Sequence, residues 1–134
     1  DAYIGLLLAL DMMLSLKKNL GDYLHEIQEE YGYYFPGRGG VEVSQQGKAL
    51  LDTLAGLEKY GVGTVLDIGG QSRRITEVIT IDGRKMILDD KSWLMIRPSG
   101  TEPKVRFYVE ARSESGKDDL FAAAKAMLSE IGLL

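Results

Sequence analysis

Residues 92–112 read SWLMIRPSGTEPKVRFYVEAR, which is two strand-like segments on either side of a short polar bend. The first segment is residues 93–97 and the second is residues 104–112. Because side chains alternate between the two faces of a strand, the second segment separates apolar from polar residues. The apolar face holds Val105, Phe107, Val109 and Ala111, and the other face holds Arg106, Tyr108, Glu110 and Arg112. The stretch therefore predicts two sheet strands joined by a loop.

The residues before this stretch predict a β-hairpin. Residues 75–81 and 84–88 have strand-like composition, and they flank Asp82-Gly83. This dipeptide between two strand-like runs is a strong short-range hairpin signal, because both residues tolerate the positive φ that the favoured turn requires. Together with the two strands above, the hairpin predicts an antiparallel sheet of about four strands.

Helical periodicity surrounds the strands. A helix is predicted over residues 45–60 and a final helix over residues 115–131, each with an apolar stripe at helical spacing. Consecutive strands with helices packed on one face form an α+β layer, and this is the fold class that we expect. Residues 62–74 are open to two interpretations, an additional strand over residues 64–68 or a mobile loop.

The N-terminal region is expected to be helical and to need a covering partner. Residues 2–18 are apolar at nearly every position, and a helix of this kind must be covered on most faces. Asp11 interrupts the stretch, which is also shorter than the ~20 residues of a membrane-spanning helix. An amphipathic helix is predicted over residues 20–31, and residues 33–40 (YYFPGRGG) are interpreted as a linker or hinge. The start at Asp1 favours a processed or excised piece, and a missing neighbouring domain would cover the apolar helix.

Composition limits the classes of function. The chain has 134 residues and a net charge of −4, which argues against a general affinity for nucleic acids or anionic membranes. Any anion-binding site must therefore be local. The chain has no cysteine, which removes disulfides, thiolate metal sites and cysteine nucleophiles. This composition is consistent with a cytoplasmic protein.

The bend at residues 97–104 (RPSGTEPK) has the composition of an anion-binding loop. Gly100 allows close approach of the backbone to a ligand, and successive N–H groups in such a turn can surround an anion. Hydroxyl and cationic donors flank it, and two prolines restrict its ends. The donors are Ser99, Thr101, Arg97 and Lys104, and the prolines are Pro98 and Pro103. A solvated turn remains the alternative interpretation.

The motif RPSGTEPK, followed by VRFYVEA, resembles the signature of the C-terminal domain of the α-D-phosphohexomutase family (phosphoglucomutase/phosphomannomutase). Trp93 and the DGRK hairpin upstream resemble the family pattern as well. DAYIGLLLALDMML and LGDYLHEI resemble the two helices that close the family's third domain. The resemblance implies that residues 1–36 are the helical tail of domain 3. It also implies that residues 37–134 are domain 4, with a TBP-like α+β fold.

The resemblance implies a function for the complete enzyme, which interconverts hexose 1-phosphate and hexose 6-phosphate. A phosphoserine in the first domain transfers the phosphoryl group through a bisphosphate intermediate, Mg²⁺ is held by aspartates of the second domain, and the third domain reads the sugar. The fourth domain clamps the phosphate that is not being transferred. The implied phosphate-binding residues are Arg97, Ser99, Gly100, Thr101 and Lys104.

The same resemblance assigns no catalytic residue and no metal ligand to this chain, so the isolated fragment is expected to be inactive and to bind no cofactor. Its expected partners are a hexose phosphate or bisphosphate and the remaining domains of its own enzyme. Self-association of the isolated fragment through residues 2–18 is also expected, because the apolar helix lacks its cover.

Several alternatives remain open at the level of sequence. The loop could serve a generic phosphometabolite-binding module, belong to a phosphoglucosamine mutase, or be a solvated turn of a purely structural domain. Lys104 resembles the glucose and mannose branches. Residues 67–70 (DIGG), His25 and Asp89-Asp90 are interpreted as a loop, a solvated side chain and hydrated turn residues respectively.

Overall fold

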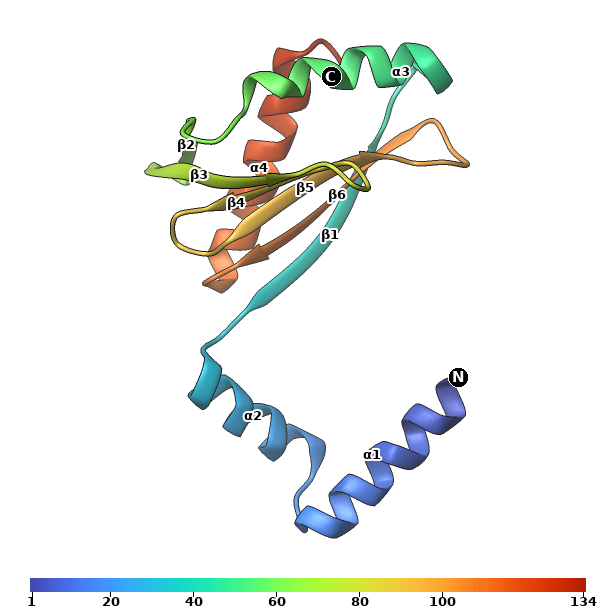
Figure 1. Ribbon diagram of the computed structural model, residues 1–134, viewed down its shortest axis with the longest axis vertical. Helices are drawn as coiled ribbons and strands as arrows, with labels where there is room; N and C mark the ends of the chain where they lie inside the picture. The colour runs from blue at the N-terminus through green and yellow to red at the C-terminus, as the bar shows by residue number, and fades with distance from the viewer. The chain divides into compact units, whose positions relative to one another are not determined.

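The computed structural model describes residues 1–134 as two units, residues 1–33 and residues 34–134 (Figure 1). The second unit contains a six-stranded antiparallel sheet in the order β1-β6-β5-β4-β3-β2. Its strands are β1 (Phe35–Glu42), β2 (Val65–Ile68), β3 (Gln71–Ile79), β4 (Arg84–Leu88), β5 (Trp93–Pro98) and β6 (Lys104–Ala111). The α+β class, the hairpin and the two strands around the polar loop are confirmed.

The predicted count of about four strands is wrong, because the sheet has six. One additional strand, β2, lies in the region that was open to two interpretations. The other, β1, replaces the expected linker over residues 33–40. Its glycines fit under aromatic rings, since a Cβ at Gly37 would lie 2.8 Å from Phe121 Cζ and a Cβ at Gly39 would lie 2.7 Å from Phe107 Cε2. Strand β1 therefore depends on contacts with distant residues.

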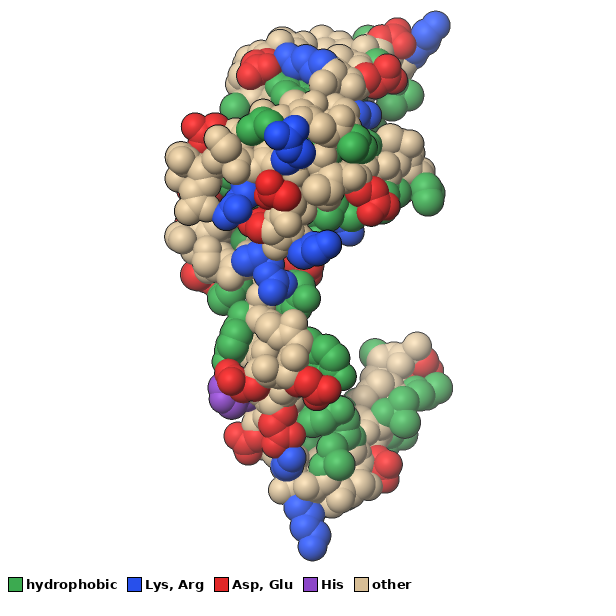
Figure 2. All heavy atoms as spheres, turned by 60° about the vertical axis from the view of Figure 1, so that its left-hand side comes forward, with side chains coloured by type: hydrophobic (Ala, Val, Ile, Leu, Met, Phe, Trp, Pro, Cys, Tyr) green, Lys and Arg blue, Asp and Glu red, His purple; other side chains and the backbone are tan.

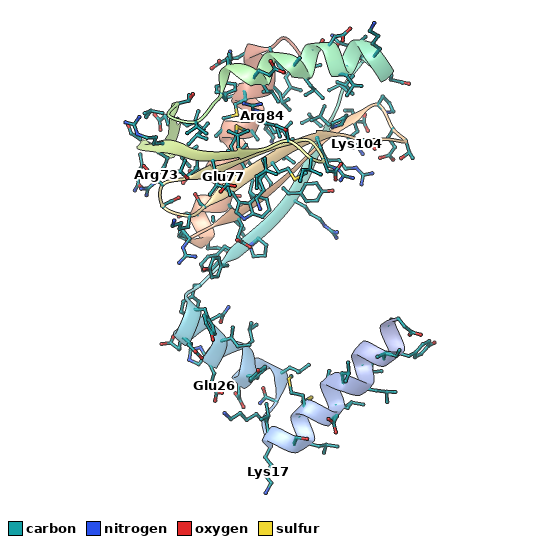
Figure 3. The ribbon with its side chains drawn as sticks, viewed as in Figure 1. Lys17, Glu26, Arg73, Glu77, Arg84 and Lys104 are labelled. Carbon is teal, nitrogen blue, oxygen red and sulfur yellow. The ribbon has the colours of Figure 1, made fainter.

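Helices complete the unit. They are α3 (Gly47–Leu54), which continues as the 3₁₀ helix η1 (Ala55–Lys59), and α4 (Glu114–Glu130). The Ser113 side chain caps α4 by accepting a hydrogen bond from the Gly116 N–H at 3.1 Å. This cap lies two residues before residue 115, where the sequence predicted the start of the helix. In Figure 3, Arg84 lies between the sheet and η1. Its Nη2 donates to the Tyr60 carbonyl at 2.8 Å, which joins β4 to the end of the 3₁₀ helix.

The core lies on one face of the sheet. The apolar set of β6 is buried as the alternation predicts, and α4 packs against β6. Phe107 and Phe121 lie with their ring centroids 5.8 Å apart. Leu50 of α3 and Leu57 of η1 are buried in the same cluster. The polar set of β6 consequently points to the opposite face, where it is partly exposed.

The first unit consists of α1 (Ala2–Leu16) and α2 (Leu20–Tyr31). Asn19 caps α2 by accepting a hydrogen bond from the Asp22 N–H at 2.8 Å, and Lys18 pairs with Glu26 at 2.5 Å. No residue of α1 is buried, and Figure 2 shows hydrophobic side chains on the surface of this unit. The large apolar side chains of α1 with exposed surface are Tyr3, Ile4, Leu6, Leu7, Leu8, Leu10, Leu14 and Leu16. None of the helices is both long enough and apolar enough to cross a membrane.

Candidate functional site

The loop between β5 and β6 is held by backbone hydrogen bonds at its base. The Ser99 N–H donates to the Lys104 carbonyl at 2.8 Å, and the Val43 N–H donates to the Pro103 carbonyl at 3.0 Å. The antiparallel pairing of the two strands places Arg97 opposite Arg106. The sheet therefore determines where the loop and its flanking cations lie, as Figure 3 shows for Lys104 at the start of β6.

Ser99, Gly100 and Thr101 line a small hollow of about 130 Å³ together with the start of α3. Gln46 is the N-cap residue of α3, and its side chain makes no capping hydrogen bond. The first N–H groups of a helix lack intrahelical acceptors and form the positive end of the helix dipole. The hollow is therefore lined by two residues with side-chain hydroxyls, by the acidic residue Glu102 and by the first residues of a helix.

Lys104 lines a second hollow of about 350 Å³ on the partly exposed face of the sheet. Arg106 and Tyr108 of β6 contribute to it, and Arg38 comes from β1, whose register places it opposite Tyr108. Within the loop, the Glu102 carboxylate lies 3.1 Å from Arg106 Nη2 and 3.9 Å from Lys104 Nζ. The hydrogen bond to Glu102, with a smaller contribution from Tyr108, raises the pKa of Arg106. The second hollow is thus cationic, with one carboxylate at its edge.

Arg97 lines neither hollow. Its Nη1 donates to the Asp82 carboxylate at the tip of the β3–β4 hairpin, and its guanidinium carbon lies 5.8 Å from the centroid of the Tyr108 ring. The Nε atom is buried and has no hydrogen-bond partner. Of the five residues expected to bind phosphate, three therefore share one hollow, Lys104 lines the next, and Arg97 is held by a carboxylate.

Two cations of this region were not among the expected site residues. Arg106 lies two residues after Lys104 on the same face of β6, so strand alternation was the signal that could have identified it. Arg38 lies in the segment that was interpreted as a linker, and only the pairing of β1 with β6 brings it to the site. The sequence around Arg38 carries no comparable signal.

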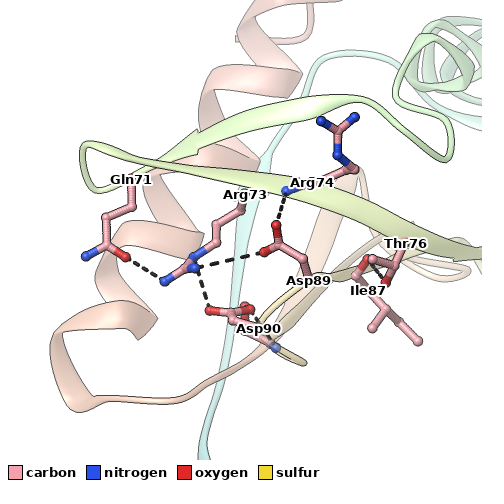
Figure 4. Close-up of polar contacts among 8 residues, drawn as sticks. Gln71, Arg73, Arg74, Thr76, Ile87, Asp89 and Asp90 are labelled. Carbon is pink, nitrogen blue, oxygen red and sulfur yellow. Dashed lines mark hydrogen bonds and ion pairs between the residues drawn. The ribbon is translucent and has the colours of Figure 1, made fainter.

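The other residues considered from the sequence have structural partners. Asp89 and Asp90 surround Arg73, with Arg73 Nε 3.3 Å from Asp90 Oδ2, and the Arg74 N–H donates to Asp89 (Figure 4). Of residues 67–70, which were interpreted as a loop, Asp67 and Ile68 end β2, and Gly69 and Gly70 form the turn to β3. Asp67 accepts a hydrogen bond from the Gly70 N–H at 2.7 Å. The chain has no group of three or more His, Cys, Asp or Glu residues placed to hold a metal ion.

Comparison with known proteins gives consistent matches. Residues 41–126 match the family described as phosphoglucomutase/phosphomannomutase, C-terminal domain. A phosphopentomutase of Thermococcus kodakarensis is 50% identical over 60 residues, which is 45% of this chain and 13% of that protein. A probable phosphomannomutase of Haemophilus influenzae is 32% identical over 88% of this chain and 25% of that protein. A probable phosphoglucosamine mutase of Methanococcoides burtonii is 33% identical over 80% of this chain and 21% of that protein. The chain thus spans a quarter or less of these relatives.

Proposed function

The chain belongs to the phosphoglucomutase/phosphomannomutase family through its C-terminal domain, and we propose that it is the phosphate-binding domain of a sugar-phosphate mutase. The complete enzyme interconverts hexose 1-phosphate and hexose 6-phosphate through an enzyme phosphoserine and a bisphosphate intermediate. This domain clamps the phosphate that is not being transferred. The phosphoserine is supplied by another part of the enzyme.

The observation that carries the proposal is the concentration of cations and amide donors at one end of the sheet. The chain has a net charge of −4, yet Lys104, Arg106 and Arg38 line one hollow and Arg97 lies opposite Arg106 in the sheet. A phosphate dianion needs several donors and a compensating positive charge, and arginine supplies both in a planar fork. The adjoining loop provides the neutral donors.

In the proposed complex each group has a distinct role. The hydroxyls of Ser99 and Thr101 and the N–H of Gly100 donate to phosphoryl oxygens, supported by the positive end of α3. Lys104 and Arg106 compensate the charge from the second hollow. Arg97 binds two oxygens through its fork once it is released from its carboxylate partner. Pro98 and Pro103 limit the loss of loop entropy when the ligand binds.

The isolated chain should bind phosphate weakly. Hydrogen bonds to charged groups contribute about 1.5–3 kcal/mol each, so four or five of them offer roughly 6–15 kcal/mol. Loss of translational and rotational freedom on association costs about 4–15 kcal/mol. We therefore expect millimolar affinity for the chain alone, and tighter binding in the complete enzyme because its other domains raise the effective concentration of the ligand.

The chain offers no suitable site for the Mg²⁺ that the family implies. Asp89 and Asp90 are adjacent carboxylates, but Arg73 lies between them and a third acidic ligand is absent. In our proposal Mg²⁺ is held by another part of the complete enzyme, where it supports phosphoryl transfer. The residues of this chain bind and orient the phosphate, and the isolated chain has no mutase activity.

The names of the relatives favour a domain that recognises the phosphoryl group of the substrate and not its sugar. They are a phosphopentomutase, a probable phosphomannomutase and a probable phosphoglucosamine mutase, whose names differ in the sugar. A phosphoryl group is the feature that their substrates share. The domain proposed here therefore binds the phosphoryl group, and the identity of the sugar is determined by other parts of each enzyme.

Titration of the isotope-labelled chain with glucose 1-phosphate, mannose 1-phosphate and AMP tests the proposal. We expect the amide resonances of residues 97–104 to shift at millimolar concentrations of both sugar phosphates, with weaker shifts for AMP. Equal responses to all three ligands would favour the generic phosphometabolite module. An unresponsive loop would exclude phosphate binding, and sub-micromolar affinity would contradict the weak clamp.

We also propose the division of the chain between two domains of the complete enzyme. Residues 1–36, which contain α1, α2 and the first two residues of β1, are the tail of the third domain, and residues 37–134 are the fourth domain. The exposed apolar surface of α1 supports this division, because a helix that is apolar on most faces and has no buried residue needs a partner to cover it. In our proposal the remaining domains of the same enzyme cover α1.

The isolated chain is expected to self-associate through α1. A double substitution, Leu7→Glu with Leu10→Glu, should shift the sedimentation of the chain towards the monomer, because it places two charges on the apolar surface. Ser15→Glu is the control, since it adds one such charge at an exposed polar position of the same helix, and it should leave the sedimentation close to that of the wild type. A wild-type chain that sediments as a monodisperse monomer with α1 ordered would contradict the expectation.

A further inference from the structure

We propose that Asp82 is a place-holder for the phosphoryl group, so that Arg97 exchanges this carboxylate for phosphate when the ligand binds; this step rests on the function proposed above. Asp82 lies in the turn of the β3–β4 hairpin, and its carboxylate pairs with Arg97 and with no other side chain. It is thus a positioning residue that acts through Arg97 and sets how readily the guanidinium reaches the ligand.

The hairpin tip is built to lie against Arg97. The pairing of β4 with β5 places Arg84 opposite Ile96, so the preceding turn reaches the end of β5. A Cβ at Gly83 would lie 2.5 Å from Arg97 Cβ and 2.6 Å from the Ile96 carbonyl oxygen, and Gly83 has a φ of 97°. Only glycine fits both the space and the backbone conformation. The close approach fixes Asp82 beside the guanidinium.

The available N–H groups of Arg97 determine how phosphate and the Asp82 carboxylate compete for its guanidinium. A guanidinium presents two edges that can bind two oxygens of one anion, the Nε–Nη2 edge and the Nη1–Nη2 edge. The Nε atom is enclosed by protein and has no partner. The remaining edge includes Nη1, which donates to Asp82. A phosphate bound through Nη1 and Nη2 therefore competes with the carboxylate for the donors of Nη1.

The pair is also weak enough to exchange. The side chain of Asp82 is 69% exposed and that of Arg97 is 31% exposed. Solvated ion pairs of this kind contribute little, because water stabilises the separated charges nearly as well. A phosphate dianion, which also accepts hydrogen bonds from Ser99 and Thr101 in the proposed complex, should bind the Arg97 guanidinium more strongly than a single monoanionic carboxylate does. Asp82 thus holds the Arg97 guanidinium in position in the absence of ligand and can be replaced by phosphate when the ligand binds.

The test compares the affinity for glucose 1-phosphate of the wild-type chain, Asp82→Asn and Glu42→Gln by titration of the loop amides. Asp82→Asn should bind about threefold more tightly, which is the gain from removing a solvated competing partner. Glu42→Gln is the control for general charge effects. Glu42 is exposed and lies opposite Lys104 in the sheet, and it has no ion pair. Its removal should raise the affinity by clearly less than Asp82→Asn does, because it removes a nearby negative charge without releasing a guanidinium donor.

A second readout follows the Arg97 guanidinium directly. In the wild-type chain its Nε–H resonance should shift on addition of glucose 1-phosphate, and in Asp82→Asn it should already be displaced without ligand. Equal gains for Asp82→Asn and Glu42→Gln would reduce the effect to net charge and overturn the exchange. Weaker binding by Asp82→Asn, or unchanged binding, would overturn it as well. An unresponsive loop in the wild-type chain would instead remove the proposed function itself.

Discussion

Replacing Arg97 by alanine is expected to lower kcat/KM of the complete mutase by at least about 100-fold. The substitution removes two charge-assisted hydrogen bonds to the phosphoryl group, each of which contributes about 1.5–3 kcal/mol. Part of the loss is offset because wild-type Arg97 must first separate from Asp82. The measurement is steady-state kinetics with the glucose and mannose phosphates as substrates, together with phosphate titration of the isolated variant chain.

Two further variants define the role of the guanidinium. Arg97→Lys keeps the charge and loses the planar fork, so its activity should fall between those of the wild type and Arg97→Ala. Arg112→Ala is the remote control, because Arg112 follows the opposite end of β6 and lies over the Tyr34 ring at 4.2 Å. It should retain most of the activity. Full activity of Arg97→Ala would support a purely structural domain whose loop is a solvated turn.

Replacing Phe107 by alanine is expected to lower the free energy of unfolding of residues 34–134 by about 3–5 kcal/mol. Phe107 is 2% exposed, and its ring packs against Phe121 and over Gly39. Truncation leaves a cavity where β1, β6 and α4 meet. Because the free energy of unfolding of a domain is only about 5–15 kcal/mol, a loss of this size would leave the variant only marginally stable. Urea unfolding followed by circular dichroism measures it.

Tyr108→Ala is the matched control for the Phe107 substitution. Tyr108 is the next residue of β6 and points to the opposite, partly exposed face. Its truncation should lower the free energy of unfolding by less than half as much. Equal losses for the two variants would show that the core does not lie on the face that the alternation assigns to it.

The parts of the fold that follow from local signals could be predicted. Asp82-Gly83 identifies the hairpin, although its loop spans residues 80–83 and only Gly83 of the pair has a positive φ. The alternation in β6 assigns its buried face in agreement with the structure. Strand β1 could not be predicted, since Pro36 and three glycines signal an irregular segment. Pro36 is compatible with a strand at the edge of a sheet, and two of the glycines, Gly37 and Gly39, pack against the rings of Phe121 and Phe107. Those contacts are invisible to local propensity.

The same distinction applies to the candidate site. The loop over residues 97–104 is contiguous in the chain, so its composition identified it. The distribution of its donors between two hollows depends on which strands pair and in which register. Arg38 reaches the second hollow through the β1–β6 pairing, and Asp82 reaches Arg97 through the β4–β5 pairing. Long-range pairing of this kind is not encoded in a short segment.

A crystal structure of the chain grown with a saturating concentration of glucose 1-phosphate tests the phosphate clamp most directly. We predict phosphoryl oxygens at about 3 Å from the hydroxyls of Ser99 and Thr101 and from the N–H of Gly100, with Lys104 and Arg106 facing the same group. A sugar phosphate bound only elsewhere, or a loop without bound phosphate at saturation, would contradict the assignment of this loop as the phosphate-binding site.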